Sequence, residues 1–186
     1  MLIAKEKEKT NIAEYVLYMW QVEDIIRSNN FDLDRITDSV INQFNSPDEI
    51  KYDMKLWYQN LITQMMKEGI SEKGHLSNTL HYVEELNNLH NSLLTTLQDI
   101  KYQEQYILAK ENLTSFMNKS GGEAKNEIHA CFIAMYGLFI LKLKQTNISG
   151  ETKEAMKTFS GLLAVLVDRY HKLKKGQLEL PKEKSN

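Results

Sequence analysis

Residues Ala130–Leu141 read ACFIAMYGLFIL, the longest apolar stretch in the chain. A membrane span needs roughly 20 such residues, so this stretch is too short to cross a bilayer and is typical of a buried helix. Because apolar side chains cover nearly its whole circumference, the helix requires neighbours on several sides. We therefore expect a helix over residues 123–144 at the centre of the fold.

The segments on either side of this stretch also carry apolar residues at helical spacing. Four of them begin with residues that favour a helix start, namely Asn11 with Glu14, Ser46 with Pro47, Asp99, and Ser149. The charged run Lys5–Lys9 is predicted to be a solvated lead-in to the first helix. Together the patterns predict an all-α bundle or array of about seven helices, over residues 11–28, 32–44, 46–68, 76–97, 99–117, 123–144 and 149–175.

The composition is that of an ordinary soluble globular protein, with 42% hydrophobic and 26% charged residues. Eight glycines and two prolines are too few for the many turns of an all-β fold. A formal net charge of -2 gives the chain no overall attraction to nucleic acid or to an anionic membrane. We expect one domain over residues 1–176, followed by a flexible charged tail over residues 177–186.

The cysteine content and the first residues of the chain indicate a compartment. The single cysteine, Cys131, cannot form an internal disulfide and lies within the apolar stretch, where it behaves as a small hydrophobe. The chain becomes charged at Lys5, so the apolar segment of a secretory signal is not expected there. Both features favour the cytoplasm.

Motifs for nucleophilic or phosphate chemistry do not occur, because GxxxxGK[ST], GxGxxG, GxSxG and paired CxxC patterns are all missing. A di-metal site in a helical bundle needs ExxH on two helices and carboxylates from two more. Here ExxH occurs once, from Glu72 to His75, at a predicted helix break. We therefore expect no catalytic residue, no cofactor and no metal site.

Two ionisable side chains lie on the inward faces of predicted helices. At about 100° per residue, Glu23 falls in the apolar arc of residues 11–28, and His90 falls in the apolar stripe of residues 76–97. A buried carboxylate needs a partner, and Arg27 is placed one turn away. We favour a buried hydrogen-bond cluster that fixes helix register. The alternative is a polar pocket for a small ligand, formed by Glu23, Arg27, His90, Trp20, Trp57 and Tyr58.

Three segments carry a resemblance to a known family. These are the stretch NIAEYVLYMWQVEDIIR over Asn11–Arg27, the residues Gly69 and Gly74-His75-Leu76, and CFIAMYG over Cys131–Gly137. The chain resembles a family of small Bacteroidetes proteins described only as a domain of unknown function, with the tail after Gly176 outside the resemblance. The resemblance implies an all-helical bacterial protein and supplies no activity, ligand or catalytic residue.

The apolar surface indicates what kind of function to expect. Helix 123–144, together with Leu17, Tyr18 and Ile25 on the outer side of helix 11–28, offers more apolar surface than one core absorbs. We therefore expect a cytoplasmic helical protein that acts by protein–protein interaction or as a homodimer, without nucleic acid or membrane partners. The alternative is a small-ligand-binding protein or metal-using enzyme with a polar pocket in the bundle core.

Overall fold

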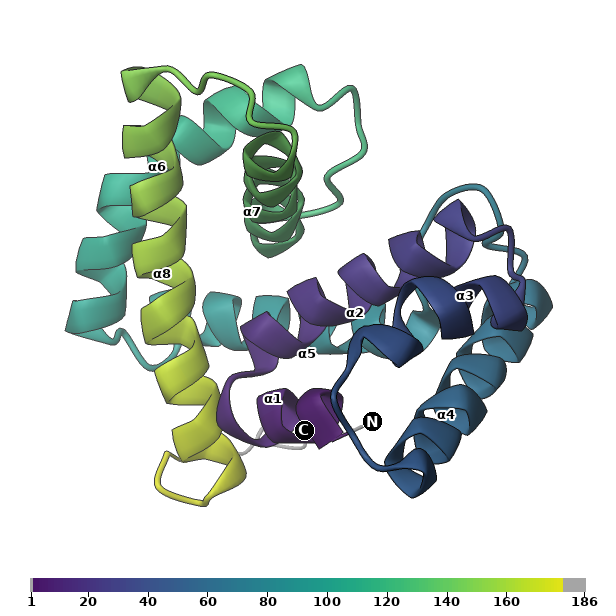
Figure 1. Cartoon of the computed structure of the whole chain (residues 1–186). Helices are drawn as coiled ribbons and strands as arrows, with labels where there is room; N and C mark the ends of the chain where they lie inside the picture. The colour runs from purple at the N-terminus through teal and green to yellow at the C-terminus, as the bar shows by residue number, and fades with distance from the viewer. Residues whose placement is uncertain (1, 179–186) are drawn as a thin grey trace. The chain divides into compact units, whose positions relative to one another are not determined.

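The computed structural model describes residues 2–178, and its regular structure is entirely helical within that range (Figure 1). This confirms the predicted all-α class. The 3-10 helix η1 covers Ile41–Gln43. The α-helices are α1 (Leu2–Thr10), α2 (Ile12–Ser28), α3 (Leu33–Ser39), α4 (Asp48–Lys67), α5 (Ser77–Thr95), α6 (Ile100–Lys119), α7 (Glu127–Leu143) and α8 (Gly150–Lys174).

The seven expected helices correspond to α2 through α8, and the structure differs from the expectation at α1, at α3 and at the start of α7. The charged lead-in is itself a helix, α1. The segment expected over residues 32–44 divides at Val40, whose φ of −124° leaves the helical region. The helix expected from residue 123 begins at Glu127, because the Asn126 side chain accepts a hydrogen bond from the His129 N–H and caps it there.

The chain divides into two compact units, and the boundary falls inside α5, after Tyr82. Unit 1 ends at Tyr82 and unit 2 begins at Val83. The single domain expected over residues 1–176 remains a prediction. The flexible tail was expected over residues 177–186, and of these, residues 179–186 lie outside the described part of the chain.

Unit 1 is built around α2, which packs against α1 and α4, while α3 packs against η1 and α4. Its fully buried side chains include Trp20, Ile26, Ile36 and Met65. The start of α2 is the one predicted from the sequence, since Asn11 Oδ1 accepts from the Glu14 N–H at 3.1 Å. At α4 the prediction is wrong by one residue, because the helix begins after Pro47 and makes no side-chain cap bond there.

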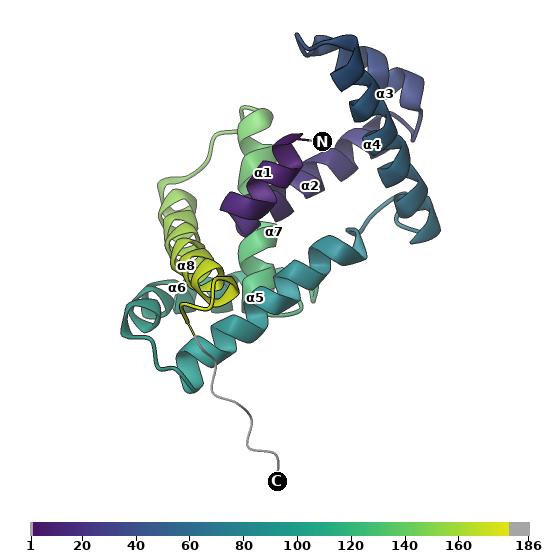
Figure 2. The same ribbon diagram turned by 90° about the horizontal axis from the view of Figure 1, so that it is seen from below.

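Unit 2 packs α8 against both α6 and α7, and α6 against α7; these helices can also be followed in Figure 2. Asp99 and Ser149 cap α6 and α8 as predicted. The first half of α7 is buried, but from Met135 onward its side chains are half-buried or exposed. An apolar helix is thus covered over only part of its length.

Candidate functional site

A buried carboxylate forms the centre of the first polar cluster. The side chain of Glu23, on α2, is fully buried in unit 1. Its Oε2 lies 2.7 Å from His75 Nδ1, and its Oε1 accepts the backbone N–H of Leu76 at 3.1 Å. The indole of Trp20 stacks on the His75 ring with 3.8 Å between ring centroids and 9° between planes. Glu23 therefore holds the chain just before α5 onto α2.

Arg27, one turn after Glu23 on α2, binds the segment that connects α4 to α5. Its guanidinium donates to the carbonyl oxygens of Ile70 and Gly74 and to Asp24 Oδ1, the last at 2.9 Å. It approaches the expected partner, Glu23, only to 4.0 Å. The closer partner of Glu23 is His75. The sequence presented His75 in two ways, at the end of an isolated ExxH and within Gly74-His75-Leu76 of the family resemblance, and neither indicated that it pairs with Glu23.

The two aromatic residues predicted from α4 lie beside each other in unit 1. The rings of Trp57 and Tyr58 meet edge to face at a centroid distance of 5.1 Å. Tyr58 is buried, and burial raises the pKa of its hydroxyl. Trp57 is only half-buried and lines a hollow.

His90 lies in unit 2 and has its own set of partners there. It is almost fully buried, with Nδ1 2.6 Å from the Tyr102 hydroxyl oxygen and Nε2 3.0 Å from Glu127 Oε2. The Tyr106 hydroxyl donates to Glu127 Oε1 at 3.1 Å. Each ring nitrogen of His90 and each carboxylate oxygen of Glu127 therefore has a polar partner within this cluster.

The charges in this second cluster have consequences for titration. The hydrogen bond from His90 holds the pKa of Glu127 below its usual range, against the opposing effect of burial. Burial, with the nearby Glu127 carboxylate, raises the pKa of Tyr106 to about 12.

The residues of the predicted polar pocket lie in different units. Glu23, Trp20 and Arg27 belong to unit 1, and His90 belongs to unit 2. The hydrogen bonds described for each polar cluster lie within its own unit.

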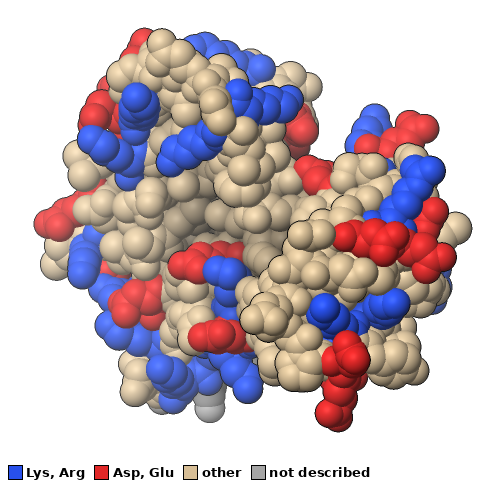
Figure 3. All heavy atoms as spheres, viewed as in Figure 1, with Lys and Arg blue, Asp and Glu red and all other residues tan. Residues whose placement is uncertain are grey.

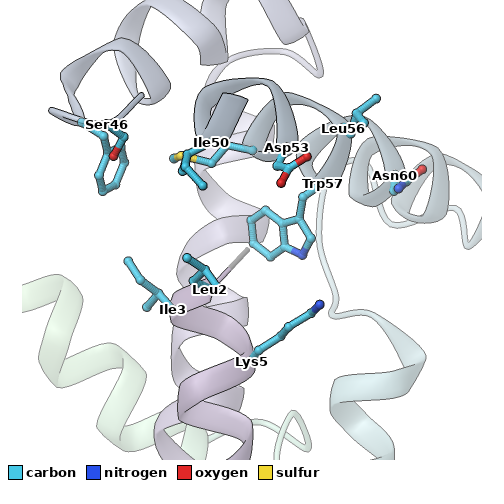
Figure 4. A pocket seen from close by; sticks show the side chains of 11 residues that line it. Leu2, Ile3, Lys5, Ser46, Ile50, Asp53, Leu56, Trp57 and Asn60 are labelled. Carbon is cyan, nitrogen blue, oxygen red and sulfur yellow. The ribbon is translucent and has the colours of Figure 1, made fainter. Parts of the chain in front are cut away.

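An open hollow of about 420 Å³ lies in unit 1 between α1 and α4 (Figure 4). Leu2 and Ile3 of α1 form one side, and Ile50 and Trp57 of α4 form the other. Lys5 and Asp53 also line it, and neither makes an ion pair with any residue of the described range. We call this site the unit 1 hollow.

A second open site, the unit 2 groove, measures about 440 Å³ and lies between α6, α7 and the first turns of α8. Phe116 and Phe159 line it from α6 and α8, and Ala134, Gly137 and Leu141 line it from one face of α7. Lys119 and Glu151 supply charged groups at the groove. Figure 3 shows mainly basic side chains over this end of unit 2, at the upper left of the view.

Residues 2–178 contain no group of three or more His, Cys, Asp and Glu side chains arranged to hold a metal ion. In the same range no helix is both long enough and apolar enough to cross a membrane. Cys131 is a free thiol whose pKa is raised by burial. The two open sites therefore offer apolar surface with isolated charged groups.

The comparisons with known proteins identify a family. The model of a family described as Domain of unknown function (DUF4924) matches residues 1–177, which is nearly the whole chain. Neither a curated protein nor a solved structure shows significant similarity to this chain.

Proposed function

The chain belongs to the DUF4924 family, and we propose that it is a protein-binding module whose unit 2 groove takes an amphipathic helix of another protein. The observation that carries this proposal is the glycine at position 137, in the middle of α7 and on the lining of the groove. We place the activity in the cytoplasm, where a lone free thiol such as Cys131 is ordinary.

A glycine inside a helix costs about 1 kcal/mol relative to alanine, so its presence calls for a reason. Packing within the chain supplies none, because a Cβ on Gly137 would meet nothing within 4 Å. Gly161 differs, since a Cβ there would lie 2.7 Å from Gln105 Oε1. An approaching helix would need the space that Gly137 leaves open, since small residues allow two helix backbones to come close.

The chemistry of the groove indicates the chemistry of the partner. Its aromatic and aliphatic lining, continued by the exposed Leu141 and Leu143 at the end of α7, suits the apolar face of a helix. Charged residues at the ends of α6 and α7 and in the first turns of α8 are mainly basic. They are Lys119, Lys142, Lys144, Lys153 and Lys157 against Glu151 and Glu154. A partner helix with acidic flanks would therefore be favoured.

The same charges argue against a second copy of this chain as the occupant. A two-fold dimer through the groove would bring two surfaces with the same excess of basic residues together, and these surfaces would repel each other. A different protein with acidic residues beside its apolar face avoids that repulsion.

Binding of a synthetic amphipathic helix tests the proposal directly. The probe carries leucines at positions i, i+3, i+4 and i+7, with glutamates on the other face, and a second probe carries lysines in their place. We expect saturable binding of the glutamate probe by calorimetry, weaker binding of the lysine probe, and at least a tenfold loss of affinity in Gly137→Phe, which fills the groove.

The matched control is Ile107→Phe, because Ile107 is 70% exposed on α6 and does not line the groove. It should bind the glutamate probe as the parent does. Equal affinity of the parent and Gly137→Phe would contradict the proposal. A dimer seen by light scattering that Gly137→Phe converts to a monomer would instead assign the groove to self-association.

A further inference from the structure

The unit 1 hollow exposes apolar side chains that the unit itself does not cover. Leu2 is 71% exposed and Leu56 is 47% exposed, and both line the hollow beside the half-buried Trp57. The fully buried Trp20 shows that unit 1 can enclose an indole completely. At about 420 Å³ the hollow is within the range of small-molecule sites.

Two side chains of opposite charge line this hollow, one from α1 and one from α4. Lys5 reaches it from α1 and Asp53 from α4, and in Figure 4 their side chains lie on either side of the Trp57 ring. Some charged residues of unit 1 are paired, as Lys7 is with Glu14 at 2.8 Å. Lys5 and Asp53 have no charged partner among residues 2–178. An ammonium group and a carboxylate are thus both available to a ligand.

We propose that the unit 1 hollow binds a small apolar zwitterion about the size of a dipeptide. Its carboxylate would meet the Lys5 ammonium, its amine would meet the Asp53 carboxylate, and its apolar body would lie against Trp57 and Leu2. The requirement for both charges on one small body separates a free dipeptide from a protein terminus, which presents only one of them. This site is independent of the unit 2 groove.

The test compares dipeptides that differ only in their end groups. Leu-Leu carries both charges, N-acetyl-Leu-Leu lacks the amine charge, and Leu-Leu-amide lacks the carboxylate charge. Exposed ion pairs are individually weak, so capping either end should lower the affinity measured by calorimetry about three- to fivefold. In Lys5→Met the free dipeptide should bind about as weakly as Leu-Leu-amide binds the parent. In Asp53→Asn, Leu-Leu should bind about as weakly as N-acetyl-Leu-Leu binds the parent.

Matched controls are Lys9→Met on α1 and Asp48→Asn on α4, which remove the same charges from exposed positions outside the hollow. Both controls, and Gly137→Phe in the unit 2 groove, should leave Leu-Leu binding unchanged. Absence of Leu-Leu binding at millimolar concentration would overturn the proposal. So would equal affinity for the free and the capped dipeptides, or an equal loss in the control variants.

Discussion

Replacing Glu23 by glutamine should destabilise unit 1 far more than the same change at Glu14, on the same helix. The two residues differ in their surroundings. Glu23 is fully buried and accepts hydrogen bonds from Leu76 and His75, whereas Glu14 is 57% exposed and pairs with Lys7. The substitution keeps the shape of the side chain and removes its charge, so packing changes little in either variant.

The expected magnitude follows from these contacts. A hydrogen bond to a charged group contributes about 1.5 to 3 kcal/mol, and breaking a buried ion pair costs about 3 to 5 kcal/mol. Glutamine can keep the bond from the Leu76 N–H, so we expect Glu23→Gln to lose roughly 2 to 3 kcal/mol. An exposed ion pair contributes at most about 1 kcal/mol, which bounds the cost of Glu14→Gln.

Urea unfolding followed by tryptophan fluorescence is the suitable assay, because both tryptophans, Trp20 and Trp57, belong to unit 1. A double-mutant cycle with His75→Ala should give a coupling energy of about 1 to 3 kcal/mol between Glu23 and His75. Equal free energies of unfolding for Glu23→Gln and Glu14→Gln, or additive effects in the cycle, would refute the assignment of His75 as the partner of the buried carboxylate.

Three further outcomes are expected in unit 2. Gly137→Ala should raise the free energy of unfolding by about 0.5 to 1 kcal/mol in urea titrations followed by circular dichroism. Gly161→Ala should raise the free energy of unfolding by less, because the new Cβ must displace the Gln105 side chain. A larger increase at Gly161 than at Gly137 would contradict this contact with Gln105. Glu127, whose folded-state pKa is lowered, contributes stability that is complete above the unfolded pKa of about 4.3 and is lost as the pH falls through the lower folded value. The difference in free energy of unfolding between the parent and Glu127→Gln should therefore shrink as the pH falls from 6 through the folded-state pKa of Glu127. A difference that stays constant would contradict the lowered pKa. Cys131 should react with a thiol reagent only when urea unfolds the chain, because it is buried and its pKa is raised; rapid labelling of the native protein would show otherwise.

The sequence by itself determined the helical class and several helix starts. The side chains of Asn11, Asp99 and Ser149 each cap an N–H group three residues away, so local chemistry decides where those helices begin. Helical spacing also determined that Glu23 and His90 face inward, because direction around one helix depends only on residue number. The helix α1 was missed because a charged run has no apolar periodicity to indicate it.

Only the tertiary structure decided which groups meet those inward side chains. His75 lies 52 residues from Glu23, and Glu127 lies 37 residues from His90, so each pairing depends on how loops return one helix to another. The two open sites arise in the same way, because a groove is a space between helices and belongs to no single segment. Periodicity specifies the face of a helix, but the packing of whole helices selects the neighbours of that face and the space they leave open at Gly137 and Trp57.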